Sequence, residues 1–236
     1  MTTMNEKQII QLQTDLRQTG YYLGNIDGIW GSGSQKAYDE FKADYAKNVP
    51  GEVKVPEAHT EGKIRWGSKV SKVFKERVIW ISKELQLANG DVLEGASQLM
   101  DCMSFESAES FRADIRNMAG SSGTGLIQFM SFTAKSLGTT TDALAKMTAE
   151  DQLNYVYKYF SGRKGKLKNL GDIYMAILWP RGIGKADTYV LWDKKTAPLA
   201  YKQNAGLDLN KDGLVVRGEA LKKILVQTER GKKYMG

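Results

Sequence analysis

Residues 103–130, MSFESAESFRADIRNMAGSSGTGLIQFM, join the end of an apolar helical pattern to an acidic residue and a glycine-rich turn. Glu106 falls three, four and seven residues after Met103, Cys102 and Leu99, so its carboxyl extends the apolar stripe. Burial among apolar side chains raises the pKa of a carboxyl group, which then stays protonated near neutral pH. Such an acid can protonate the leaving oxygen of a sugar, so the stretch predicts glycosidase chemistry.

Small residues follow the acid over 119–125, where glycines allow a close approach of the backbone to a ligand. Helical character is expected to resume over 126–137. A solvated glutamate at a helix end is the structural alternative for Glu106, because most glutamates lie in water.

The same stretch resembles the goose-type lysozyme and soluble lytic transglycosylase superfamily, and especially phage cell-wall lysozymes with a Trp/Phe-Glu-Ser segment and a Gly-Leu-Ile-Gln-Phe-Met turn. The resemblance implies that Glu106 is the catalytic acid and that Ser107, Gly125 and Gln128 contact the sugar. Glu109 is an alternative acid, because Glu109-Ser110 also fits the shorter Glu-to-Gly spacing of the transglycosylases. We favour Glu106, since Phe105 precedes it and the apolar stripe leads to it.

Net charge and the distribution of apolar residues indicate which kind of partner the protein binds. The net charge of the 236 residues is +7, of which residues 1–48, with five basic and six acidic side chains, contribute −1, so the rest carries +8. No nucleic-acid motif accompanies the charge, and we therefore expect an anionic envelope polymer rather than nucleic acid as the partner. No apolar run is long enough to span a membrane, and the first residues lack the core of a signal peptide.

Histidine and cysteine are too scarce for other wall-degrading chemistries. His59 is the only histidine and lies in a segment that reads as a linker, and the only cysteine, Cys102, is expected in the core. Zinc amidases need several His or Cys ligands, and a cysteine peptidase needs a histidine base. Among the chemistries that degrade a cell wall, this leaves acid–base catalysis by the carboxyl groups of Asp or Glu.

The first 48 residues resemble a small three-helix peptidoglycan-binding module. A helix is expected over 5–19, then a turn-rich connector, then a helix from Gln35 to about Ala46 with Ser34 as its N-cap. Asp27 and Trp30 lie in the Asp-Gly-x-Trp-Gly turn that the resemblance assigns to this module, which would bind stem peptides or glycan. Taken alone, however, a tryptophan such as Trp30 is more often a core residue than a ligand contact.

Other segments give weaker signals. Residues 49–69 read as a linker, and helices are expected over 70–81 and 144–160. The tyrosines of the latter helix could stack on sugars or simply pack. The charge run 163–168 is expected to be a solvated loop.

Residues 172–185, DIYMAILWPRGIGK, resemble in position a later motif of the superfamily, Ala-Tyr-Asn-Ala-Gly-x-Gly, although Pro180 replaces its Asn. The resemblance makes Tyr174 and Trp179 candidates for the far wall of the cleft, with burial in the core as the alternative.

Residues 208–219 match a twelve-residue calcium loop. Its ligands would be Asp208, Asn210, Asp212, Glu219 and the Leu214 carbonyl, with Gly213 at the sharp turn. The alternative is a turn that caps the final helix through local hydrogen bonds. The basic stretch that follows, to 236, is expected to be helical at first and could approach an anionic outer membrane.

These observations predict a mainly α protein with a peptidoglycan-binding module over 1–48, a linker over 49–69 and a lysozyme-like domain over 70–236. We expect a monomeric, phage endolysin-type muramidase that needs no cofactor for catalysis. It would be made in the host cytoplasm and act on the periplasmic wall. Glu109, Asp114 and Asp172 are the candidate second carboxylates. The alternatives are a lytic transglycosylase, a non-catalytic wall-binding protein and a virion protein.

Overall fold

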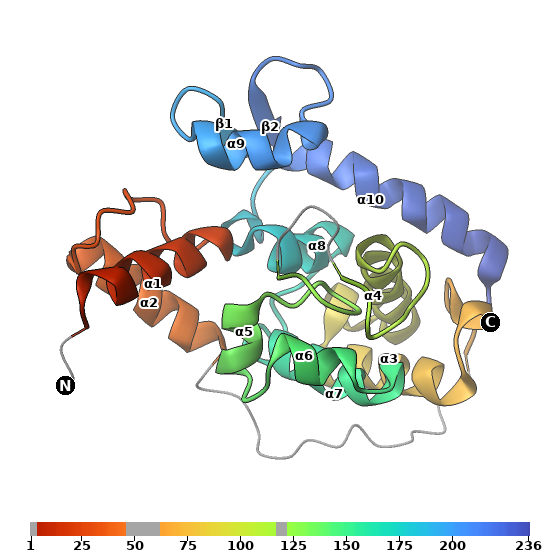
Figure 1. The fold of residues 1–236 in the computed structure, drawn as a ribbon. Helices are drawn as coiled ribbons and strands as arrows, with labels where there is room; N and C mark the ends of the chain where they lie inside the picture. The colour runs from red at the N-terminus through yellow and green to blue at the C-terminus, as the bar shows by residue number, and fades with distance from the viewer. Residues whose placement is uncertain (1–3, 46–61, 117–121) are drawn as a thin grey trace. The chain divides into compact units, whose positions relative to one another are not determined.

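The computed structural model describes residues 4–45, 62–116 and 122–236. These residues are mainly helical, as predicted, and include one two-stranded antiparallel sheet (Figure 1). No helix in these ranges is both long and apolar enough to cross a membrane. His59 and most of the expected linker lie outside the described residues, as do positions 117–121 of the small-residue loop.

The chain divides into two compact units, each built from two stretches of sequence. The first unit comprises residues 1–54 and 112–163, and the second comprises residues 55–111 and 164–236. The predicted division at 48 and 69 stays a prediction. What the structure adds is that residues 112–163 group with the N-terminal helices.

The first unit holds α1 (Glu6–Gln18), α2 (Ser32–Tyr45), α5 (Ser131–Ser136), α6 (Thr141–Ala145) and α7 (Ala149–Ser161). Residues 4–45 thus contain two described helices. Asn5 caps α1 by accepting a hydrogen bond from the Gln8 amide. Phe41 of α2 is buried and stacks on Phe132 of α5 at 4.4 Å between ring centroids. The core of this unit therefore joins segments about 90 residues apart in sequence.

Three local expectations for this unit are wrong. Ser34 is not an N-cap, because α2 begins at Ser32 and the Ser34 hydroxyl is buried against Gln13. The helix expected over 126–137 is reduced to α5, because Gly125 and Gln128 adopt positive φ values of 76° and 52° in a turn. The helix expected over 144–160 is interrupted, because Thr148 caps a new helix by accepting a hydrogen bond from the Asp151 amide.

The charge run 163–168 does not begin as a solvated segment. Arg163 is buried, and its guanidinium donates hydrogen bonds to the Tyr21 hydroxyl at 2.6 Å and to Asp44 at 3.0 Å. A buried guanidinium is tolerated because both partners accept from it. The expectation of a solvated loop is therefore wrong at Arg163, whereas Lys164, Lys166 and Lys168 are exposed.

The second unit holds α3 (Lys72–Leu85), α4 (Val92–Glu106), α8 (Leu170–Leu178), α9 (Pro198–Asn204) and α10 (Arg217–Gly231). Short 3-10 turns extend it at Gly67–Lys69, Leu87–Gly90, Pro180–Gly182, Ala205–Leu207 and Lys232–Tyr234. Strand β1 (Val190–Asp193) pairs antiparallel with β2 (Leu214–Val216), with Val190 opposite Val216 and Asp193 opposite Leu214.

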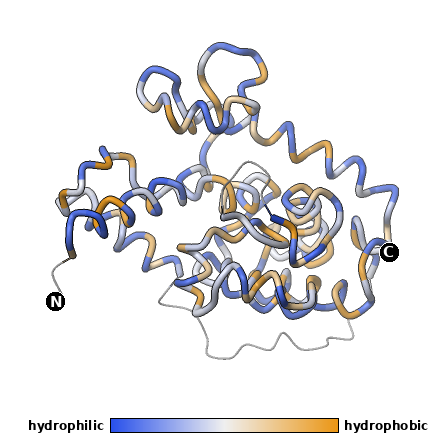
Figure 2. The backbone as a smooth tube through the Cα atoms, viewed as in Figure 1, coloured by the Kyte–Doolittle hydropathy of each residue, from blue (hydrophilic) through white to orange (hydrophobic). Residues whose placement is uncertain are grey.

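Helix α4 is the centre of the second unit, since it packs against α3, α8 and α10. Its apolar residues Ala96, Leu99, Met100, Cys102 and Met103 are buried, and Cys102 is a core residue as expected. Helix α10 alternates hydrophilic and hydrophobic stretches along its length (Figure 2). Burial of one face of such a helix, here by Ala220 and Ile224, is what attaches it to the unit.

Candidate active site

The position of Glu106 follows from the two ends of α4. Asp91 caps the helix by accepting a hydrogen bond from the Glu94 amide, and the last helical residue is Glu106. Between these ends the helix passes from a polar to an apolar environment. Glu94 and Asp101 face ionised partners, whereas Glu106 does not.

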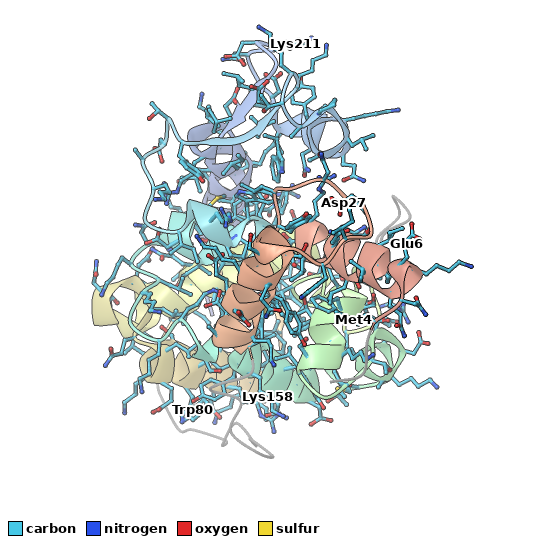
Figure 3. The ribbon with its side chains drawn as sticks, turned by 90° about the vertical axis from the view of Figure 1, so that its left-hand side faces the viewer. Met4, Glu6, Asp27, Trp80, Lys158 and Lys211 are labelled. Carbon is cyan, nitrogen blue, oxygen red and sulfur yellow. The ribbon has the colours of Figure 1, made fainter. Side chains whose placement is uncertain are left out.

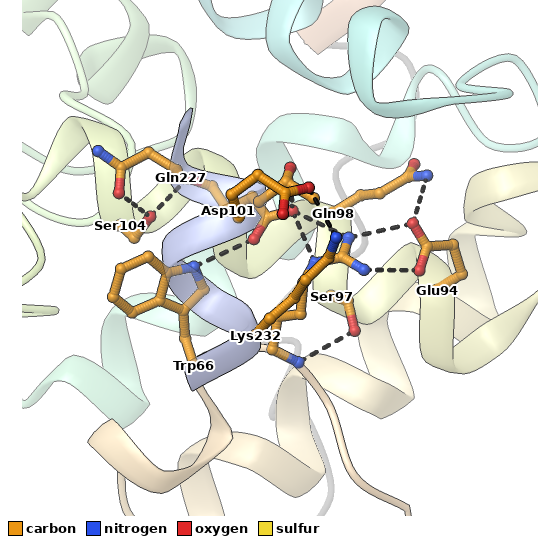
Figure 4. A network of polar contacts seen from close by, with 11 residues as sticks. Trp66, Glu94, Ser97, Gln98, Asp101, Ser104, Gln227 and Lys232 are labelled. Carbon is orange, nitrogen blue, oxygen red and sulfur yellow. Dashed lines mark hydrogen bonds and ion pairs between the residues drawn. The ribbon is translucent and has the colours of Figure 1, made fainter. Parts of the chain in front are cut away.

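A polar network surrounds the middle of α4 (Figure 4). Asp101 is fully buried and accepts hydrogen bonds from Arg65 Nε at 2.9 Å, Trp66 Nε1 at 3.0 Å and Thr228 Oγ1 at 2.9 Å. Arg65 also forms an ion pair with Glu94. Every oxygen of Asp101 thus has a donor, and this carboxylate joins α4 to α10 and to the segment before α3.

Glu106 is half-buried and its side chain forms no hydrogen bond or ion pair with any residue in the described ranges. Burial raises its pKa to about 8. Phe105 and Tyr174 meet edge to face at 5.8 Å, and the charge of Glu106 in turn raises the pKa of the buried Tyr174 and Cys102, for which burial is the larger cause. Glu106 is therefore a protonated carboxylic acid at neutral pH, with an apolar and aromatic lining.

The chain turns sharply after Glu106. Ala108, Glu109 and Phe111 have positive φ values of 50°, 62° and 50°, which side chains other than glycine rarely adopt. Ser107 holds the turn: its buried hydroxyl donates to the Met103 carbonyl at 2.7 Å and accepts from the Phe111 amide at 3.0 Å. The resemblance gave Ser107 a substrate contact, but the structure places its hydroxyl in this turn.

Glu109 differs from Glu106 in its partners. Its carboxylate lies 2.7 Å from the guanidinium of Arg230 on α10, with 21% of the Glu109 side chain exposed. The Glu109 carboxylate is thus held by a guanidinium, whereas Glu106 has no polar partner among the described residues. Of the two candidate acids, the geometry favours Glu106.

Asp172 is buried at the start of α8 and lies 3.2 Å from the Arg217 guanidinium. It also accepts hydrogen bonds from the amides of Lys168 and Gly184. These bonds join α8 to the start of α10, a structural role. Tyr174 and Trp179 are buried as well, and Trp179 packs edge to face on Trp192. Both therefore lie in the core in the structure.

Gly125, Gln128 and Asp114 belong to the first unit. Gly125 is buried, and a Cβ there would lie 2.2 Å from the Gln152 side chain, so only glycine fits. Gln128 donates a hydrogen bond to the Gly125 carbonyl. Asp114 is exposed, and its ion pair with Arg112 lowers its pKa. All three candidate second carboxylates, Glu109, Asp114 and Asp172, are thus ion-paired.

Gln13 organises the turn that contains Asp27 and Trp30. This fully buried side chain donates hydrogen bonds to Asp27 Oδ1, the Ile29 carbonyl and Ser34 Oγ, and it accepts from the amides of Asp27 and Gly28. Asp27 itself is exposed (Figure 3) and also accepts from the Ile29 amide. Trp30 is half-buried and packs edge to face on Tyr38. Sequence reasoning did not recognise the role of Gln13.

A groove of about 690 Å³ lies in the first unit between α1, α2 and α5, and we call it the α1–α2–α5 groove. Tyr38, Phe41 and Phe132 form an aromatic part, whereas Asp15, Lys42 and Lys135 are the charged residues that line it. Sequence analysis did not anticipate it, because it depends on packing between helices far apart in the chain. Its size is that of a small-molecule site.

Residues 208–219, the predicted calcium loop, form the local hydrogen bonds that are expected of a turn that caps the final helix. Glu219 accepts from the amides of Leu209, Asn210 and Val216, and Asp212 accepts from the Leu214 amide. In the described ranges, no group of three or more His, Cys, Asp or Glu side chains is gathered as a metal site.

Comparison with protein-family models gives no match, and comparison with curated proteins gives no significant match.

Proposed function

We propose that the protein is an endolysin-type peptidoglycan-cleaving enzyme in which Glu106 protonates the oxygen of the β-1,4 bond between N-acetylmuramic acid and N-acetylglucosamine. The observation that carries the proposal is a half-buried carboxyl group without a polar partner among the described residues, whose pKa burial raises to about 8. A general acid must hold its proton at the working pH and release it to the leaving group. Activity should therefore fall as the pH rises through about 8.

Once the bond to the leaving sugar is protonated, an oxocarbenium-like state forms and must be captured. A second carboxylate activates water in a hydrolase. In a lytic transglycosylase the C6 hydroxyl of the muramic acid attacks instead, and one carboxylate suffices. The three candidate second carboxylates are all paired with arginines, which is the specific observation that favours the transglycosylase as a second candidate.

Binding to the wall is proposed for the first unit, through the α1–α2–α5 groove. Its aromatic rings offer apolar faces to sugar rings or alanine methyl groups. Lys42 and Lys135 suit the carboxylates of a stem peptide, and Asp15 suits its free amine. This groove supports the expected wall-binding role more directly than Asp27, whose carboxylate is bonded to Gln13 and to the Ile29 amide.

The test compares Glu106→Gln with Glu109→Gln on purified peptidoglycan, with released fragments identified by mass spectrometry. Glu106→Gln should lower the rate by about 10²–10⁴-fold, the usual contribution of a general acid. Glu109→Gln is the matched control and should keep most activity. Products one water lighter than reducing sugars identify the transglycosylase, and ordinary reducing ends identify the hydrolase.

Pelleting with insoluble peptidoglycan separates the remaining alternatives. Glu106→Gln should bind as wild type does, whereas Tyr38→Ala in the groove should bind less. If wild type releases no fragments yet pellets with the wall, the protein is a binding protein and the catalytic proposal is wrong.

A further inference from the structure

Residues 208–219 contain a buried carboxylate oxygen that the structure does not satisfy. Asp208 is 6% exposed. Its Oδ2 accepts hydrogen bonds from the Tyr201 hydroxyl at 2.6 Å and the Gly213 amide at 3.0 Å. Its Oδ1 is buried and lacks a donor at good hydrogen-bond geometry among the described residues. The Tyr201 hydroxyl, followed by the amides of Gly213, Lys211 and Asp212, lowers the pKa of this carboxyl. An unsatisfied buried oxygen of this kind is rare, and an ion or a water is a common reason for one.

The same segment carries negative charge without a compensating side chain. Asp208, Asp212 and Glu219 form no ion pair with a residue of the described ranges. Lys211 lies within the loop but is exposed, and Figure 3 shows it at the outer end of the loop. Three carboxylates within twelve residues attract a cation, and an ion bound between them offsets their mutual repulsion.

The oxygen atoms occur at the positions that a calcium loop uses. Counted from Asp208, side-chain oxygens stand at positions one, three, five and twelve, and the Leu214 carbonyl stands at position seven. Gly213 at position six has a φ of 88°, the left-handed conformation that the sharp turn of such a loop requires. The set contains oxygen alone, which suits a hard cation and not zinc or copper.

We propose that this loop binds a calcium ion through Asp208 Oδ1, the side chains of Asn210, Asp212 and Glu219, and the Leu214 carbonyl. Glu219 now bonds to three backbone amides, and it exchanges amide bonds for the ion on binding. Val216, at position nine, offers no side-chain oxygen. We therefore expect weak binding, with a Kd of about 10⁻⁴–10⁻³ M, the range of extracellular calcium modules.

The ion would order the start of α10. The loop is linked to α9 through Tyr201, and it leads through β2 into Arg217, the first residue of α10. Arg217 in turn bonds to Asp172 of α8 and Asp187. Calcium should thus raise the thermal stability of the second unit, because a ligand that binds only the folded state stabilises it.

The test is terbium luminescence of the full chain, because Tb³⁺ replaces calcium and is excited by a nearby tyrosine. Tyr201 bonds directly to Asp208 and is placed to sensitise the ion. We expect a saturable signal that Ca²⁺ displaces at a concentration at least about 10-fold lower than Mg²⁺ does, because Mg²⁺ loses its water shell reluctantly.

Variants decide whether the signal comes from this loop. Asp208→Ala should weaken Tb³⁺ affinity by at least about 10-fold, the usual effect of losing part of a metal site. If that variant fails to fold, Asp212→Asn, at an exposed position, makes the same test. Glu229→Gln on α10 is the acidic control and should bind as wild type does.

Three results would overturn the proposal: no saturable signal in wild type, a signal that the loop variants leave unchanged, or equal displacement by Mg²⁺. None of these measurements uses cleavage of peptidoglycan, so their outcome is independent of the proposed enzyme activity.

Discussion

Helix α4 carries two acidic groups five residues apart, the fully buried Asp101 and the half-buried Glu106, and their surroundings differ. Asp101 accepts hydrogen bonds from Arg65, Trp66 and Thr228, whereas the Glu106 side chain has no polar partner in the described part of the chain. Burial raises the pKa of both, but only for Asp101 do donors counteract it. The presence or absence of hydrogen-bond donors, more than burial, thus distinguishes a structural carboxylate from a reactive acid.

The largest expected effect is a loss of stability on replacement of Asp101. Asp101→Ala should lower the free energy of unfolding by about 3–5 kcal/mol, because it leaves the buried Arg65 with only its half-exposed partner Glu94. Urea unfolding followed by far-UV circular dichroism measures the change. The control is Asp142→Ala, which breaks an exposed ion pair with Arg116 and should change stability little. A loss at Asp101 no greater than that at Asp142 would contradict the structural role.

The second largest expected effect is an increase in the free energy of unfolding, on replacement of Glu106. The pKa of Glu106 is about 8 in the folded protein and 4.5 ordinarily, so the folded state binds the proton more tightly. Its contribution to stability is complete below pH 4.5 and is lost as the pH rises through about 8. Glu106→Gln cannot ionise, and it should therefore be more stable than wild type at pH 9 by ~2 kcal/mol or more.

Urea unfolding at pH 4, 7 and 9 tests this pH dependence. The two proteins should differ least at pH 4, and Glu109→Gln, whose carboxylate is ion-paired, should show no such gain at high pH. A Glu106→Gln variant less stable than wild type at pH 9 would show that Glu106 is ionised and paired after all.

The smallest effect concerns Arg230. Its side chain is 54% exposed, so Arg230→Gln should change the free energy of unfolding by at most ~1 kcal/mol and leave most of the wall-cleaving activity. Thermal unfolding and the peptidoglycan assay measure both. If activity instead fell as far as in Glu106→Gln, Glu109 and its partner would belong to the catalytic machinery.

The sequence allowed the helices with a clear apolar period to be predicted. The expectations of helices near 5–19 and 70–81 and of an apolar helix leading to Glu106 are confirmed by α1, α3 and α4. Short-range signals were less reliable: Ser34 resembled a cap but lies inside α2, and Thr148 interrupts a pattern that looked continuous. A side chain that both fits a helix and caps one is ambiguous from its neighbours alone.

Polar contacts between distant residues escaped sequence reasoning. Arg65 is 36 residues from Asp101, and Arg163 is 119 residues from Asp44. Each of these arginines looks like an ordinary surface cation in its own segment, and only packing shows that it is buried. For the candidate site, the raised pKa of Glu106 follows from the apolar stripe that the sequence displays, whereas the choice against Glu109 required Arg230, 121 residues away.

The turn after Glu106 has a consequence for engineering. Ala108 is exposed and has a φ of 50°, a conformation that costs alanine energy and glycine almost none. Selection for heat resistance alone would therefore favour glycine at this position. The added backbone freedom would lie two residues from Glu106. A variant made more thermostable in this way would therefore hold the carboxyl group of Glu106 less firmly in its catalytic orientation.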